Sequence, residues 1–106
     1  MKDLQLINLV GIWKNEDFPM FNYNDKIEIC INIWDKCVAV SIKKPGEEPL
    51  TIASGFVKLK LQGNNTFIIQ PTDFLNDRFE IQCKYYDGAS FVAKIEPYEE
   101  RYFVKL

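Results

Sequence analysis

The strict alternation of side chains over residues 26–34 constrains the fold of this chain more than any other feature. Every second position is an isoleucine, and the residues between the isoleucines are mostly charged, polar or aromatic. The isoleucines are Ile27, Ile29, Ile31 and Ile33, and the residues between them are Glu28, Cys30, Asn32 and Trp34. A period of two is the period of a β-strand, so this segment is predicted to form a strand with one buried face.

A second alternating segment, Cys37–Lys44, begins only two residues after the first one ends. The register that sets Ile33 opposite Val38 also sets Glu28 opposite Lys43, which is a pair of opposite charges on the outer face. Because both faces agree with one register, the two segments are predicted to form an antiparallel hairpin with a two-residue loop.

Alternating segments separated by turn residues continue along the chain, and 36 of the 106 residues are β-branched or aromatic against four alanines. Strands are predicted over residues 9–15, 26–34, 37–44, 50–62, 66–70, 78–85, 89–96 and 101–106. Ser54-Gly55 interrupts the fourth strand and predicts a bend or bulge there. An antiparallel meander of eight strands loses its exposed edges when it closes. The chain is therefore predicted to be all-β: a single eight-stranded, antiparallel, up-and-down β-barrel domain over residues 1–106, with at most short helical turns.

The registers of two later hairpins are predicted in the same way, from the register that pairs apolar residues with each other on the inner face. The first sets Leu61 opposite Phe67 around a three-residue loop that contains Asn65, a residue able to adopt a left-handed conformation. The second sets Cys83 opposite Phe91 around another three-residue loop.

The register predicted for the last two strands sets Ile95 opposite Tyr102. It places Arg101 on the outer face of the barrel, in one cross-strand row with Arg78 and Glu96. Exposed ion pairs of this kind are worth roughly 0–1 kcal/mol, so they select a register more than they stabilise the fold.

Charge and composition exclude several classes of function. The net charge is −2 from 13 basic and 15 acidic residues, with no run of like charges longer than a pair. This balance argues against a nucleic-acid partner and against a polybasic membrane-binding surface. No apolar run approaches the roughly 18 residues of a membrane span, and no signal peptide is seen, so a cytoplasmic protein without a membrane span is expected.

Residue types that usually catalyse reactions or bind metal ions are scarce in this chain. The chain has no histidine, which is the commonest general acid–base residue and metal ligand. Its cysteines, Cys30, Cys37 and Cys83, are odd in number and widely spaced, which indicates reduced thiols without a disulfide or a metal site. No P-loop, nucleophile elbow or dinucleotide-binding motif occurs. We therefore predict no catalytic residue, no metal and no cofactor, and expect the protein not to be an enzyme.

The segment Leu9-Val10-Gly11-Ile12-Trp13-Lys14 resembles the Gly-x-Trp opening of the lipocalin-like (calycin) barrels. Together with eight strands and a terminal arginine, it looks like short bacterial lipocalin-like domains of unknown function. The resemblance implies that Gly11 and Trp13 close one end of the barrel and that a basic residue of the last strand, Arg101, packs over the tryptophan. Since parity places Arg101 outside and Trp13 inside, either the last strand twists near Arg101 or this contact is absent.

Two places are candidates for binding. Trp34 falls on the outer face at the end of a hairpin, and exposed aromatic residues are enriched in protein interfaces. The connection after the first strand carries four large apolar residues in an irregular segment. They are Phe18, Met20, Phe21 and Tyr23. These residues either close the barrel end as a lid, line the mouth of a ligand site, or form a patch for a partner.

Two functions follow, with different kinds of partner. The first is a protein-interaction module, such as an inhibitor, adaptor or accessory subunit, built on a filled barrel. The second, implied by the lipocalin resemblance, is a binder of one small apolar ligand inside the barrel. An eight-stranded barrel is just wide enough to be filled by side chains or to hold one small ligand. The inward residues here are mostly bulky, which favours a filled core and an unknown protein partner.

Overall fold

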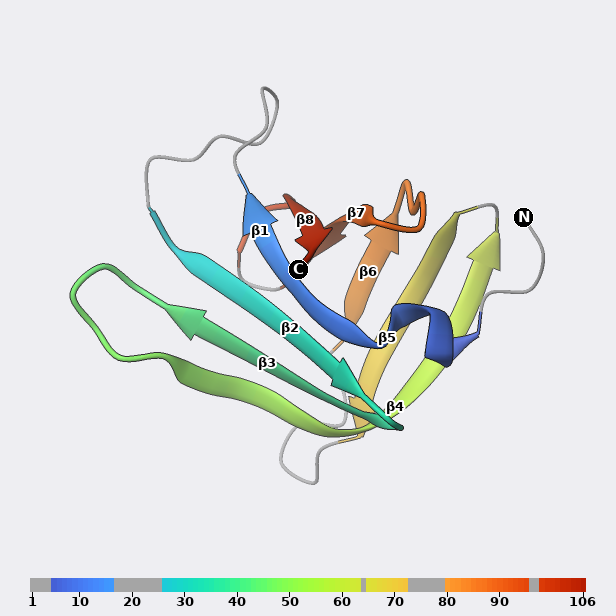
Figure 1. Cartoon of the computed structure of the whole chain (residues 1–106), viewed down its shortest axis with the longest axis horizontal. Coiled ribbons are helices and arrows are strands. Elements are labelled where there is room, and N and C mark those ends of the chain that lie inside the picture. The colour runs from blue at the N-terminus through green and yellow to red at the C-terminus, as the bar shows by residue number, and fades with distance from the viewer. Residues whose placement is uncertain (1–4, 17–25, 64, 73–79, 96–97) are drawn as a thin grey trace.

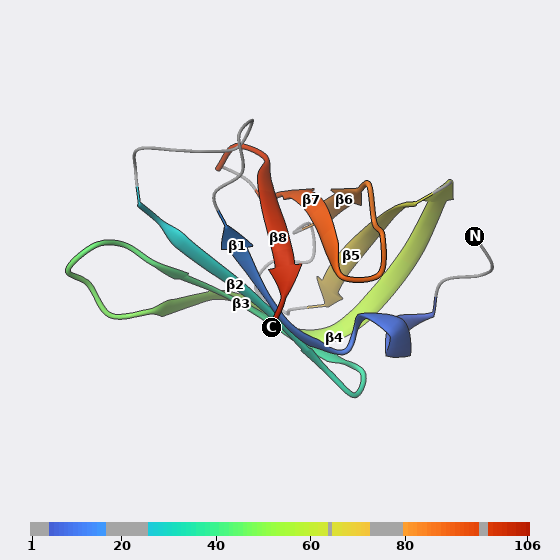
Figure 2. The ribbon, with the colours of Figure 1, turned by 45° about the horizontal axis from the view of Figure 1, so that its top comes forward.

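Eight antiparallel strands close into one barrel in the computed structural model, which describes residues 5–16, 26–63, 65–72, 80–95 and 98–106 (Figure 1). A single turn of 3-10 helix, η1 (Leu6–Leu9), precedes the first strand. The strands are β1 (Gly11–Glu16), β2 (Glu28–Trp34), β3 (Cys37–Lys43), β4 (Leu50–Gly63), β5 (Thr66–Thr72), β6 (Ile81–Lys84), β7 (Ser90–Lys94) and β8 (Arg101–Lys105). Each strand pairs with its sequence neighbours, and β8 lies between β7 and β1 and completes the ring (Figure 2). The all-β, eight-stranded, up-and-down barrel predicted from the sequence is therefore confirmed.

The register of the β2–β3 hairpin is the predicted one along its whole length. Ile33 pairs with Val38 and Glu28 pairs with Lys43, so the isoleucines of β2 all face the barrel interior. The loop has two residues, and Asp35 takes the left-handed conformation with a φ of 52°. Aspartate tolerates this conformation better than most residues, which allows so tight a turn.

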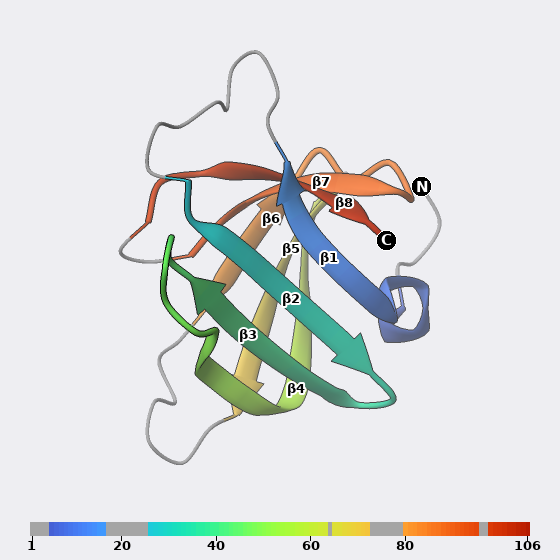
Figure 3. The ribbon, with the colours of Figure 1, turned by 60° about the vertical axis from the view of Figure 1, so that its left-hand side comes forward.

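The long strand β4 pairs with β3 through its first half and with β5 through its second half (Figure 3). The register shifts opposite Val40 and Ser41, where Ile52 is the extra residue of a bulge. The predicted interruption at Ser54-Gly55 thus lies next to the observed bulge, and Gly55 itself has a φ of 137°, which side chains disfavour.

The register of the β6–β7 hairpin differs from the prediction by two residues. Cys83 pairs with Ala93 and not with Phe91, and the loop between the strands spans five residues. Asp87 stabilises this longer loop because its Oδ1 accepts hydrogen bonds from the backbone N–H groups of Ala89 at 2.9 Å and Ser90 at 2.8 Å. Those hydrogen bonds also hold the pKa of Asp87 below its usual value. A shift of two keeps every side chain on its predicted face.

The register of β7 with β8 corrects the prediction for Arg101. Ala93 pairs with Arg101 and Phe91 pairs with Phe103, so Arg101 points inward and is 4% exposed. The physical reason is Phe103, whose ring is fully buried and stacks on Phe91 with 5.7 Å between ring centroids. Arg78 and Glu96, the predicted outer neighbours of Arg101, lie outside the described residues.

Candidate functional site

One end of the barrel is closed around Trp13. Its side chain is fully buried, and its indole Nε1 donates a hydrogen bond of 2.9 Å to the carbonyl oxygen of Leu9 in η1. Strand pairing sets Lys105 of β8 directly opposite Trp13, and the Lys105 Nζ lies 5.6 Å from the indole ring centroid. The basic residue of the last strand that lies over Trp13 is thus Lys105, while Arg101 begins the same strand four residues earlier.

Gly11 makes room for the lysine that lies over Trp13. A Cβ atom at Gly11 would be 2.7 Å from the Cε of Lys105, which is closer than two carbon atoms approach without displacement. The φ of Gly11 is 143°, a conformation that other residues rarely adopt. Glycine therefore suits this position chiefly through its backbone conformation, and an added Cβ would also displace the end of the flexible Lys105 side chain.

Aromatic rings fill the barrel interior next to Trp13. The Trp13 ring lies 4.6 Å from that of Phe91, and Phe67 meets Phe91 edge-on at 5.8 Å between centroids. Around them, the side chains of the core cluster are 0–5% exposed, as in a close-packed core, while the inward Val57 and Leu59 of β4 are partly buried. The described interior is thus occupied by the protein's own side chains.

The outer surface of β1 to β4 carries an apolar face near the β2–β3 turn. Strand pairing sets Trp34 beside Cys37 and Cys37 beside Phe56, which makes one outward row across three strands. Ile12 continues this surface on β1, and the backbone N–H of Leu106 donates a 2.9 Å hydrogen bond to its carbonyl oxygen. We define the apolar face by its large exposed side chains, which are Ile7 (74% exposed), Ile12 (41%), Trp34 (45%), Phe56 (68%) and Leu106 (72%).

A groove of about 500 Å³ adjoins this face between η1 and the β2–β3 turn. Its floor is apolar and consists of Leu6, Ile7 and Val10, whereas Asp35 and Lys36 of the turn stand at its rim. Because Gly11 pairs with Ile33, the chain at Val10 passes next to Trp34, so groove and apolar face are continuous.

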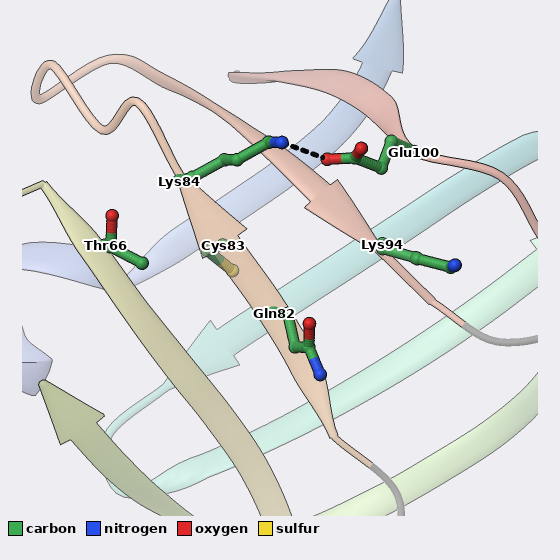
Figure 4. A pocket seen from close by; sticks show the side chains of 6 residues that line it. All are labelled: Thr66, Gln82, Cys83, Lys84, Lys94 and Glu100. Atoms are coloured by element: carbon green, nitrogen blue, oxygen red, sulfur yellow. Dashed lines mark ion pairs between the residues drawn. The ribbon is translucent and has the colours of Figure 1, made fainter. Parts of the chain in front are cut away.

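The opposite side of the barrel is polar. A pocket of about 210 Å³ lies over β6, lined mainly by the side chains that Figure 4 labels, and Lys84 Nζ is 2.9 Å from Glu100 Oε2 across it. This ion pair raises the pKa of Lys84. Cys83 also borders the pocket, but burial raises the pKa of its thiol, which therefore stays protonated and is a poor nucleophile.

The other cysteines lie on the outer face of β2 and β3, as predicted, and all three are free thiols. Burial raises the pKa of Cys30, although nearby Lys14 and Ser41 act in the opposite direction. Among the described residues, no group of three or more cysteine and carboxylate side chains is arranged to hold a metal ion. The described part of the chain also contains no helix that is both long and apolar enough to cross a membrane.

The structure describes only one of the two predicted binding places. Trp34 is exposed and lies in the middle of the apolar face. The loop residues Phe18, Met20, Phe21 and Tyr23 lie outside the described residues. Phe56 is a residue of this face that was not predicted as a binding residue, although alternation along β4 places it on the outer face with Lys58 and Lys60.

A scan against protein-family models, a search of curated proteins and a search of solved structures each find no match to this chain.

Proposed function

We propose that this chain is a non-enzymatic protein-interaction module that binds a protein partner through the apolar face. The observation that carries the proposal is the row of Trp34 and Phe56 on the outside of the barrel. Five of the eight large hydrophobic side chains exposed in the described chain belong to the apolar face. Contiguous exposed apolar surface rimmed by polar residues is typical of interaction sites, and aromatic residues are enriched there.

The packed interior supports a scaffold role for the barrel. A rigid, filled barrel holds the apolar face in one shape, which lowers the entropy cost of binding a partner. The alternative, one small apolar ligand inside the barrel, has less support because Trp13, Phe67 and Phe91 occupy the described interior themselves.

We also propose that the barrel is lipocalin-like. Gly11 and Trp13 at the start of β1, the closed ring of eight strands, and a lysine of the last strand over the indole ring support this assignment. It concerns the scaffold and leaves the choice of partner to the outer surface.

The proposal is tested with a tagged form of this 106-residue chain, which is used to retain proteins from a lysate of its own host. Trp34→Ser and Phe56→Ser remove apolar area from the face, and Tyr85→Ser, at a side chain that is 70% exposed in the β6–β7 loop, is the matched control. We expect the wild type and Tyr85→Ser to retain the same protein and the two face variants to lose it. Retention by all four chains, or by none of them, would contradict the proposal.

A further inference from the structure

The groove and the outward row of Trp34 and Phe56 meet at the β2–β3 turn. Lys36 of this turn is exposed and stands at the rim of the groove. Its carbonyl oxygen accepts a 2.9 Å hydrogen bond from the backbone N–H of Val57, so the turn lies against β4 directly after Phe56 (Figure 1). One lysine therefore borders both the groove and the aromatic row.

Two further lysines continue the outward row along β4. Lys58 and Lys60 are exposed and alternate with the inward side chains of β4, so they lie on the same outer side as Phe56. At about 3.3 Å per residue, their Cα atoms are about 7 and 13 Å from that of Phe56. Strand pairing sets Gln70 and Ile68 of β5 beside these two lysines, so the neighbouring strand offers them no acidic side chain at these positions.

A fourth lysine borders the groove from the side of β8. Lys105 is exposed, and the end of its side chain lies beside Gly11, where an added Cβ would be 2.7 Å from the lysine Cε. Gly11 directly follows Val10 of the groove floor, so this lysine stands close to the groove as well. We define the lysine border as the four residues Lys36, Lys58, Lys60 and Lys105.

The described side-chain charges around this part of the apolar face are mainly positive. The four lysines stand against one acidic side chain, Asp35 of the turn, which leaves a net charge of +3. Lys14 and Glu28 lie 3.6 Å apart and pair with each other, and with Leu106 they line a different pocket. Because the whole chain carries a net charge of −2, the positive charge is a local property of this surface.

A partner that covers this surface must supply apolar area and negative charge together. The groove of about 500 Å³ is concave with an apolar floor, which suits side chains that project from a protein segment. An anionic bilayer would lie across the groove without filling it and would face Asp35 at its rim. The barrel is closed, so the segment cannot add a strand to the sheet and is held through its side chains.

We infer that the occupant of the apolar face is an acidic segment of a partner protein. Its large apolar side chains enter the groove and cover Trp34 and Phe56, while its aspartates and glutamates face the lysine border. The inference rests on the proposed function and gives the chemistry of the partner. Apolar contact at the centre supplies most of the affinity, and the charges at the rim select the partner and speed its association.

Selection from a phage-displayed library of random peptides, about 16 residues long, tests this inference without a known partner. On the wild-type chain, we expect enrichment of peptides that combine large apolar residues with an acidic excess, of net charge about −3 or lower. On the double variant Lys58→Glu, Lys60→Glu, whose border is no longer positive, we expect enrichment of apolar peptides that are neutral or basic. This altered preference also requires that the variant is folded.

An enriched acidic peptide, labelled with fluorescein, then gives dissociation constants by fluorescence anisotropy. We expect the double variant Lys58→Glu, Lys60→Glu to bind it at least about tenfold more weakly than the wild type, and Lys58→Gln, Lys60→Gln to be intermediate. The matched control is Lys43→Glu, Lys44→Glu, which makes the same change in net charge at the other end of the β2–β3 hairpin. We expect this control to bind within about twofold of the wild type, and binding to weaken as salt rises.

The outcomes separate this inference from the proposed function. Enriched peptides that need Trp34 and Phe56 but carry no acidic excess overturn the inference and leave the proposed function in place. If no peptide is enriched, the inference fails, and retention of a host protein in a Trp34-dependent way decides the proposed function by itself. Vesicles of phosphatidylcholine with about 30% phosphatidylserine test the membrane alternative. If the chain sediments with them through Lys58 and Lys60 while no acidic peptide is enriched, both fail.

Discussion

Gly11 shows how a residue without a side chain shapes the closed end of the barrel. We expect Gly11→Ala to lower the free energy of unfolding by about 1–3 kcal/mol, because its φ of 143° is strained for alanine and the new Cβ displaces Lys105. Urea unfolding followed by tryptophan fluorescence measures this loss. Gly46→Ala is the matched control, since Gly46 also has a positive φ, of 78°, and its Cβ would meet no atom within 4 Å.

The contribution of Lys105 is separated by a double-mutant cycle with Lys105→Ala. Once the lysine side chain is removed, the contact with the new Cβ disappears and only the backbone strain remains. We therefore expect Gly11→Ala to cost less in the Lys105→Ala background than in the wild type. Equal costs in both backgrounds would show that the lysine side chain does not depend on the missing Cβ.

Single residues also show what sequence can and cannot predict about the site. The exposure of Trp34 follows from alternation alone, as do the outward thiols of Cys30 and Cys37 and the buried thiol of Cys83. The neighbours of Trp34 do not follow from it, because Phe56 is 22 positions away and reaches it only through Cys37 of the intervening strand. A site made of three strands is visible only once all their registers are known.

At the scale of elements, the register of a strand pair could be predicted where the residues on both faces favour the same register and the connecting loop is short. The β2–β3 and β4–β5 pairs meet both conditions, and Ile33 with Val38 and Leu61 with Phe67 pair as predicted. The β6–β7 loop does not, since side-chain hydrogen bonds of Asp87 favour five residues over three. Strand β8 fails the first condition, because its alternate positions are apolar on both faces.

The orientation of β8 can be tested with two aromatic neighbours. Phe103 is fully buried, and we expect Phe103→Ala to cost about 3–5 kcal/mol of unfolding free energy, as core phenylalanines do. Tyr102 faces outward and is only partly buried, so Tyr102→Ala is expected to cost less than half as much. The same urea titration measures both variants. A larger loss for Tyr102 would restore the register that places Arg101 outside.

For the whole molecule, the closed ring explains why an apolar face can exist on a stable barrel. Pairing of β1 with β8 leaves no exposed sheet edge among the described strands, so hydrophobic side chains on the outside do not promote strand addition. The sequence predicted the closure from the number of strands and their order. The apolar face also depends on the curvature that brings η1 beside the β2–β3 turn (Figure 3), which no local pattern encodes.

A closed ring of eight strands has no intrinsic first strand, and this predicts the behaviour of a circular permutant. In one permutant, a linker of about six Gly/Ser residues joins residue 106 to residue 1, and the chain is opened between Pro45 and Gly46. This permutant keeps every strand pair and loses one turn hydrogen bond, from the N–H of Glu47 to the carbonyl oxygen of Lys44. We expect this permutant to unfold cooperatively, within about 2 kcal/mol of the wild type. Opening the chain between Lys58 and Leu59 instead cuts β4 where it pairs with β5, so this second permutant is expected not to fold. Chemical denaturation compares the stability of the two permutants. Only the pairing of β1 with β8 brings the ends of the ring together, so loss of folding in the first permutant would contradict that pairing.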